Sequence, residues 1–104
     1  MAAPYNPPNK NEDFIVRIAL YDMSTAGSFR VNPTIVAGDF KVDKDGGGLT
    51  NLSTLPTVEP SGSVLVKITL SSTEMNADVV TIVGIDQSNP KEWADFVLAI
   101  PTTQ

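Results

Sequence analysis

Hydrophobic and polar residues alternate most clearly between Val64 and Ile85, and the rest of the chain is organised around this stretch. From Val64 to Leu70 every second residue is apolar, so that one face of a strand would be apolar throughout. This two-residue period is typical of a strand with one side in a core. From Val79 to Ile85 both faces are apolar, which is typical of a strand inside a sheet that is covered on both sides. The stretch therefore predicts two buried strands.

The residues between these strands, from Ser71 to Asp78, are mostly polar and predict a corner. Ser71 and Glu74 have the spacing of a capping box, in which the two side chains bond reciprocally to backbone N–H groups. The spacing favours one turn of helix over a tight hairpin. A corner of this kind carries the chain from one sheet to the facing sheet, so Ser71, Glu74 and Asp78 are expected to have a structural role.

Alternation elsewhere predicts five further strands. They lie at residues 13–21, 34–37, 39–44, 49–52 and 92–100. Pro33 restricts the second of these to an edge or a short fragment, because proline has no N–H for a strand ladder. Asp45-Gly46 is typical of a type I′ hairpin turn. The segment from Ser53 to Ser63 is rich in proline and is expected to be a long surface connection.

Seven short strands with a turn about every ten residues predict an all-β fold, an antiparallel β-sandwich with the order of an immunoglobulin-like Greek key and no disulfide. A jelly roll or a small barrel is the alternative. The domain is expected to span residues 13–101. It follows an extended Pro-rich N-terminal arm at residues 1–12 and precedes a short C-terminal tail at residues 102–104.

Trp93 is the largest packing group of the chain and is the expected anchor of the core. In the predicted last strand it shares a face with Val97, whereas Phe96 and Leu98 belong to the other face.

The composition places the chain among single-domain globular proteins. It has 104 residues, of which 41% are apolar, and no apolar run approaches the ~20 residues that span a bilayer. The first residues contain no apolar segment of the secretory kind. We therefore expect a protein that is made in the cytoplasm, is not exported by the usual route and does not bind a membrane.

Charge and missing residue types exclude several functions. Twelve acidic residues oppose seven scattered basic ones, a net charge of −5 that repels nucleic acid. Cysteine and histidine are both absent, which removes disulfides, thiolate nucleophiles, the usual zinc sites and histidine acid–base chemistry. No cofactor is expected, and only carboxylates, lysine, tyrosine and hydroxyl groups remain for catalysis.

Two groups of acidic residues are candidate chemical sites. Asp43 and Asp45 fit the first ligands of an EF-hand loop, but Gly47 and Thr54 stand where further ligands are needed, so a hairpin turn is the better interpretation. A weak calcium site is the alternative, with Asp39, Asp43 and Asp45 as ligands. Glu74 and Asp78 lie four residues apart and could form a carboxylate pair for acid–base catalysis. The capping role of Glu74 and the solvent expected around Asp78 explain the two residues without catalysis. No catalytic or metal residue is predicted.

The N-terminal arm is open to two interpretations. It is either a frayed terminus or an extended arm that lies along a neighbouring subunit. In the second case the contacts would come from Pro4, Tyr5, Pro7 and Pro8, with Tyr5 as the anchor.

Two motifs follow one another along the chain, GDFKVDKDGGGLTNL and, after the Pro-rich loop, ITLSSTEMNADVVTIVGID. The first holds Lys41, Asp45, Gly46 and Gly47 in the pattern K-x-x-x-DGG, and the second holds Leu70, Ser71, Glu74, Met75, Asn76, Ala77 and Asp78 in the pattern L-T/S-x-x-E-M-N-A-D. Together they resemble small structural proteins of tailed bacteriophages, over about residues 13–100.

The resemblance implies a non-enzymatic building block located in the virion. The first expectation is a capsid decoration or cement protein that binds the major capsid protein on the outside of the head and stabilises it. The second is a tail, collar or fibre-associated part that binds other virion subunits. A glycan- or host-surface-binding module is an alternative of another class, and self-association into a homo-oligomer remains open.

Overall fold

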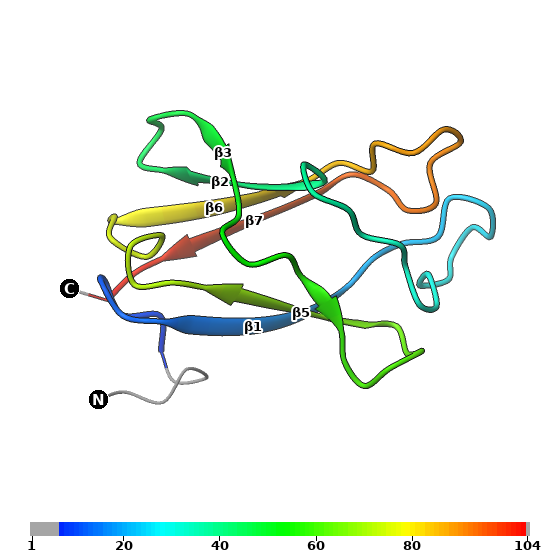
Figure 1. Ribbon diagram of the computed structural model, residues 1–104, viewed down its shortest axis with the longest axis horizontal. Helices are drawn as coiled ribbons and strands as arrows, with labels where there is room; N and C mark the ends of the chain where they lie inside the picture. The colour runs from blue at the N-terminus through cyan, green and yellow to red at the C-terminus, as the bar shows by residue number, and fades with distance from the viewer. Residues whose placement is uncertain (1–6, 104) are drawn as a thin grey trace.

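The computed structural model describes residues 7–103, which form seven strands in two antiparallel sheets (Figure 1). The strands are β1 (Phe14–Ala19), β2 (Phe40–Lys44), β3 (Leu49–Asn51), β4 (Thr57–Val58), β5 (Leu65–Leu70), β6 (Val79–Gly84) and β7 (Phe96–Pro101). One sheet has the order β1-β5-β4 and the other β3-β2-β6-β7. The predicted antiparallel β-sandwich is confirmed. The strands of an immunoglobulin fold are lettered along the chain, and its two sheets have the orders B-E-D and C′-C-F-G. With β1 to β7 lettered B, C, C′, D, E, F and G, the two sheets of this protein have the same orders, so the connections are those of an immunoglobulin-like Greek key.

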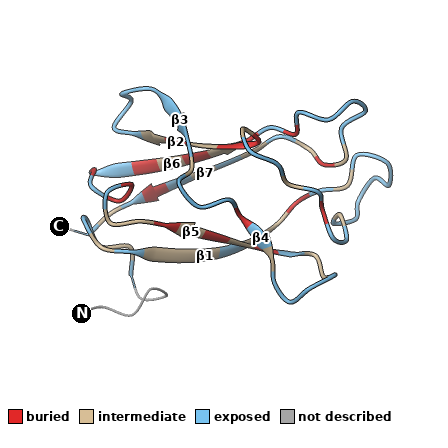
Figure 2. Cartoon of the chain, viewed as in Figure 1, coloured by how far each residue is buried: buried red, intermediate tan, exposed pale blue. Residues whose placement is uncertain are grey.

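The core lies between the two sheets and is filled by every second residue of the central strands (Figure 2). β5 and β6, each paired on both sides, supply most of it, because Val and Ile suit a pleated, packed surface. The fully buried aliphatic residues of these strands are Val66, Ile68, Leu70, Val80 and Ile82. Within residues 7–103 no helix has the length and apolar character needed to cross a membrane.

Aromatic rings close the core at the end where β7 begins. Trp93 is completely buried, with its ring centroid 5.4 Å from that of Phe40. Gly84 lies opposite Phe40 in the sheet, where an added Cβ would come within 2.9 Å of the Phe40 ring. The missing side chain therefore makes room for the ring.

The predicted strand at residues 92–100 begins too early. β7 starts at Phe96, and Trp93 lies in the loop before it, where its backbone forms an isolated bridge with Asp22. The alternation is consequently reset between the two residues: Trp93 is buried, whereas Val97, which was assigned to the same face, is 66% exposed.

Two further predictions about elements are wrong. Residues 34–37 form no strand, because side chains satisfy their backbone: Trp93 Nε1 donates to the Thr34 carbonyl at 3.2 Å, and the Val36 N–H donates to Asp39 at 2.9 Å. The segment from Ser53 to Ser63 is more than a surface connection, since it contains β4, which pairs with β5, and the buried Pro56.

β6 is covered on one side only, contrary to the pattern of its sequence. Its inward residues are buried, but Val79 on its outward side and Ile85, which directly follows the strand, are each 39% exposed. No element of the described chain packs over this outward side (Figure 2).

The described part of the N-terminal segment is bound to the domain. The Lys10 N–H donates to the Thr103 carbonyl at 2.9 Å, and the Thr103 N–H donates to the Pro8 carbonyl at 2.8 Å. Pro7 is exposed and Pro8 half-buried. Pro4 and Tyr5 lie outside the described residues.

Candidate binding groove

The corner between β5 and β6 forms the reciprocal pair expected of a capping box. The Ser71 N–H donates to Glu74 Oε1 at 2.9 Å, and the Glu74 N–H donates to Ser71 Oγ at 3.2 Å. Glu74 also accepts the N–H of Ser53 at 3.0 Å, so one buried carboxylate joins the corner to the β3–β4 connection. The corner carries the chain from the first sheet to the second.

Asp78 at the end of the corner points away from Glu74. Its carboxylate is 67% exposed and lies 3.1 Å from Lys10 Nζ, whereas Glu74 is buried. The structure therefore brings no carboxylate pair together here, and each group has a separate partner.

The other notable carboxylates hold loops in place. Asp45, at the hairpin turn between β2 and β3, accepts the N–H groups of Val79 and Asp78, and these hydrogen bonds hold its pKa below the ordinary value. Burial alone would raise the pKa of Asp86, but hydrogen bonds from Ser88 and from the backbone N–H of Glu92 outweigh it and the pKa is lowered.

The alternative of a calcium site is wrong for this arrangement. Asp39, Asp43 and Asp45 each bind different backbone N–H groups, those of Val36 and Gln87, of Gly46 and Gly48, and of Asp78 and Val79. Among residues 7–103 no three acidic side chains gather around a common point as metal ligands would.

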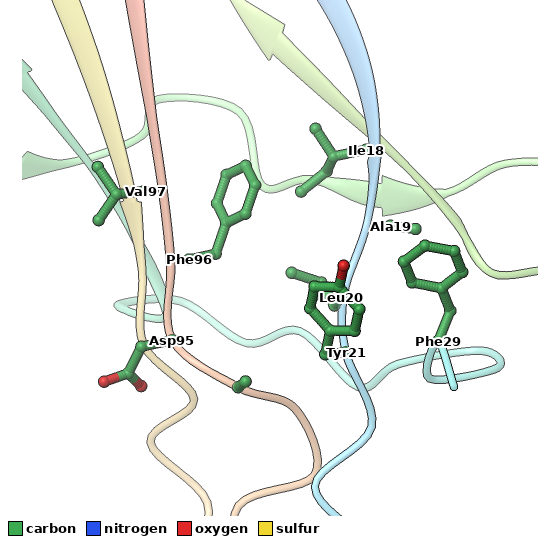
Figure 3. A pocket seen from close by; sticks show the side chains of 9 residues that line it. Ile18, Ala19, Leu20, Tyr21, Phe29, Asp95, Phe96 and Val97 are labelled. Atoms are coloured by element: carbon green, nitrogen blue, oxygen red, sulfur yellow. The ribbon is translucent and has the colours of Figure 1, made fainter. Parts of the chain in front are cut away.

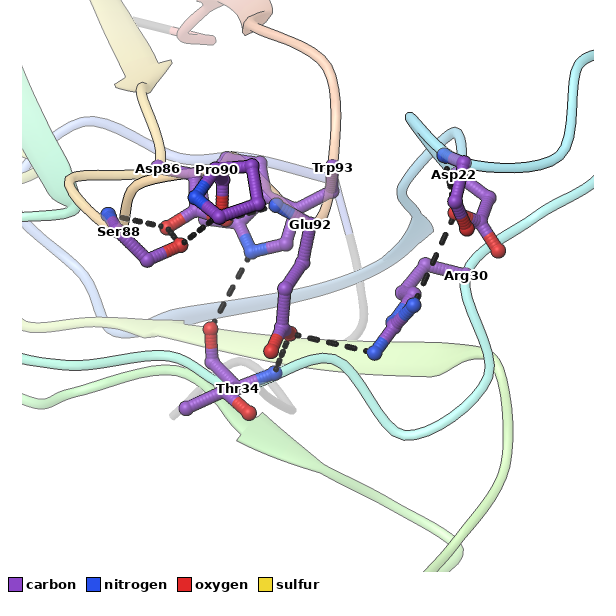
Figure 4. A network of polar contacts seen from close by, with 9 residues as sticks. Asp22, Arg30, Thr34, Asp86, Ser88, Pro90, Glu92 and Trp93 are labelled. Atoms are coloured by element: carbon purple, nitrogen blue, oxygen red, sulfur yellow. Dashed lines mark hydrogen bonds and ion pairs between the residues drawn. The ribbon is translucent and has the colours of Figure 1, made fainter.

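A polar network joins the loop after β1 to the loop before β7 (Figure 4). Glu92 accepts the Thr34 N–H at 3.1 Å and lies 3.7 Å from Arg30, whose other guanidinium nitrogen lies 3.8 Å from Asp22. The network fixes the two loops beside each other, and together they form one wall of a groove.

This groove has a volume of about 490 Å³ and opens between the two sheets (Figure 3). Its lining comes from the end of β1, the start of β7 and the adjoining loops, and comprises Ile18, Ala19, Leu20, Tyr21, Phe29, Ala94, Asp95, Phe96 and Val97. Tyr21 and Phe29 stack with ring centroids 5.2 Å apart and remain 61% and 48% exposed. The surface is mainly apolar and accessible.

Both strands that border the groove are edge strands. β1 pairs only with β5, and β7 only with β6, among the strands of residues 7–103. An edge strand presents backbone N–H and C=O groups that an added extended segment can bind. The groove therefore lies beside two strand edges, although the carbonyls of Leu20 and Tyr21 in its lining already accept the N–H groups of Arg30 and Ala94, at 2.6 and 2.9 Å.

Sequence reasoning did not find the groove, because its walls are far apart along the chain. Ile18 and Phe96 lie within predicted strands, and Phe29 lies outside all of them. One sequence feature does point to the groove. Leu20 and Tyr21 are consecutive and therefore face opposite sides of the first strand, so an inward Leu20 predicts an exposed Tyr21 ring.

Comparison of the chain with protein-family models, with curated proteins and with solved structures finds no match.

Proposed function

We propose that this chain is a non-enzymatic structural protein of a tailed-bacteriophage virion, and that it binds the outer surface of the head as a decoration protein. The observation that carries the proposal is the apolar groove between two edge strands, at which Tyr21 and Phe29 remain exposed. Such a site suits an extended segment of a neighbouring protein. The two sequence motifs support the virion origin.

The acidic composition agrees with a location outside the head, away from packaged DNA. Small contacts also suffice there, because the symmetry of a capsid repeats each of them many times. The tail, collar or fibre base is the second location, and the groove would serve equally well in it.

Cryo-electron microscopy of the phage particle produced together with this protein tests the proposal. We expect density on the outer surface of the head, at a copy number comparable to that of the capsid protein. Density confined to the tail or neck would contradict the head location. Absence from the particle would contradict the whole proposal.

A binding assay tests the groove itself. Particles lacking the protein are mixed with the wild type and with Phe29→Asp, which places a charge in the groove. We expect Phe29→Asp to reduce bound protein at least about tenfold, because an apolar contact is replaced by a buried charge. Leu55→Asp is the control, since Leu55 is 43% exposed and does not line the groove.

A glycan-binding module remains the candidate of another class, favoured by the exposed ring of Tyr21. Trp93, which would have strengthened this candidate on the surface, is buried. Binding to immobilised glycans that is lost in Tyr21→Ala, without binding to particles, would support this second function.

A further inference from the structure

The outward face of the β3-β2-β6-β7 sheet is apolar and uncovered. Residues directly opposite each other in a sheet point to the same side, so Lys41, Val83 and Val97 form one row and Asp43, Thr81 and Ala99 the next. We call the outer apolar face the surface made by Leu49, Val79, Val83, Ile85, Val97 and Ala99.

The outward face of the other sheet differs in kind. There Arg17 and Lys67 lie opposite each other and both approach Glu59, at 3.3 and 3.5 Å. Ion pairs of this type keep a sheet face in water. The two outward faces therefore differ in how their charges are paired.

Lys41 and Asp43 are the charged residues on the outer apolar face. Lys41 forms no ion pair with any carboxylate of residues 7–103. Asp43 accepts the N–H groups of Gly46 and Gly48, at 2.8 and 2.9 Å, which fix its carboxylate at the end of this face beside the hairpin turn. One unpaired base and one fixed acid therefore lie two residues apart on a single strand.

We propose that a second copy of this chain covers the outer apolar face in a two-fold symmetric dimer. A two-fold axis that runs across the strands at the level of Val42 exchanges the two rows. Lys41 of each copy then faces Asp43 of the other, and Val97 faces Ala99. The interface then holds two identical Lys41–Asp43 pairs, because a two-fold axis repeats every contact.

The sequence of β6 fits this arrangement. Its residues are apolar on both sides, which is the pattern of a strand covered on both faces. Within one copy only the inward face is covered, and the second copy supplies the other cover.

The size of the face determines how stable the dimer is. Four strands about 4.8 Å apart and about five residues long give a surface roughly 15 Å by 17 Å. A standard interface buries about 800 Å² on each partner, which exceeds this surface. The dimer is therefore reversible, and its fraction rises with protein concentration.

Sedimentation velocity between about 1 μM and about 1 mM tests the proposal. The wild type is expected to shift from monomer to dimer over this range. Val83→Lys at the centre of the face and Lys41→Glu, which would oppose Asp43 of the second copy, are each expected to weaken dimerisation at least about tenfold. The effect of Lys41→Glu should shrink as salt screens the charges.

Two matched variants serve as controls. Leu65→Lys adds the same charge to the opposite sheet, where Leu65 is 38% exposed, and Lys44→Glu makes the same reversal at an exposed site of the same hairpin. Both should dimerise like the wild type. Thermal unfolding of every variant establishes that the monomer is folded.

Three results would overturn the proposal. The first is a wild type that stays monomeric throughout the range. The second is a dimer that Val83→Lys and Lys41→Glu leave intact, because another surface would then be responsible. The third is a monomeric wild type whose binding to particles is reduced by Val83→Lys, because the face would then contact a different protein. Val97 borders both the groove and the outer apolar face, so binding through the groove is tested separately, with Phe29→Asp.

Discussion

Trp93 stabilises the sandwich from a position outside the strands. Its indole packs against Phe40, and its Nε1–H donates to the carbonyl of Thr34, at 3.2 Å. The same side chain thus fills the core and fixes a loop that has no strand partner. Both roles depend on its burial, which is complete.

Replacement of Trp93 by alanine is expected to cost about 3–5 kcal/mol, a large part of the ~5–15 kcal/mol that stabilises a domain. Unfolding in guanidinium chloride measures the loss. Trp93→Phe should cost less, because a ring remains while the Thr34 carbonyl loses its donor. Val97→Ala is the exposed control and should change the free energy of unfolding by about 0.5 kcal/mol or less. A Trp93→Ala variant as stable as this control would contradict the assigned role.

Glu74 is the second residue on which a local structure depends. Glu74→Ala leaves the N–H groups of Ser71 and Ser53 without their acceptor and is expected to cost about 1–3 kcal/mol. Ser71→Ala should cost about 1 kcal/mol through loss of the cap. A double-mutant cycle measures the coupling between them. Fully additive effects would mean that the reciprocal bonds do not act together.

At the scale of elements, the β2–β3 hairpin and the β5–β6 corner are joined through Asp45. Asp45 has a φ of 54° and Gly46 one of 81°, which fits the type I′ turn predicted for this pair. The turn places the Asp45 carboxylate against the N–H groups of Asp78 and Val79. The β2–β3 turn thereby supplies the acceptor for the N–H of Val79, the first residue of β6.

This contact predicts how stability changes with pH. Because the folded pKa of Asp45 is lower than its ordinary value of 3.8, the stabilisation is fully present above the unfolded pKa and is lost as the pH falls through the folded one. We expect the free energy of unfolding in urea to fall below about pH 4. Asp45→Asn should show a smaller fall. Asp95→Asn, whose carboxylate binds Lys91, is the control, and an equal fall in both variants would contradict the assignment.

Elements with strong alternation were predictable from the sequence, and weak ones were not. β5 follows its pattern closely, since packing against the core imposes the period, whereas β6 was predictable as a strand but not in the cover of its second face. β4 has only the two residues Thr57 and Val58, which is too short for any period. Residues 34–37 are apolar enough for a strand, but the backbone of Thr34 is hydrogen-bonded by the side chains of Glu92 and Trp93 instead. These partners are far away along the chain, so the local sequence does not predict them.

At the scale of the whole molecule, two surfaces differ from the rest of the exterior. The groove joins residues of both sheets, and the outer apolar face belongs to one sheet alone. The face was partly visible in the sequence, as the second apolar side of β6. The groove was not, because it arises only when β1 and β7 become edges on the same side of the sandwich.

Both ends of the described chain leave the sandwich at the same end, where Asn9 and Thr103 form a parallel bridge (Figure 1). The groove lies toward the other end, since it is lined by the last residues of β1 and the first residues of β7. A fluorescent protein or an antigen joined at Pro7 or Thr103, the ends of the described chain, would therefore lie at the end of the sandwich away from the groove. Two different cargoes, one at each of these positions, would be carried side by side. The connectivity thus makes the chain a scaffold for display.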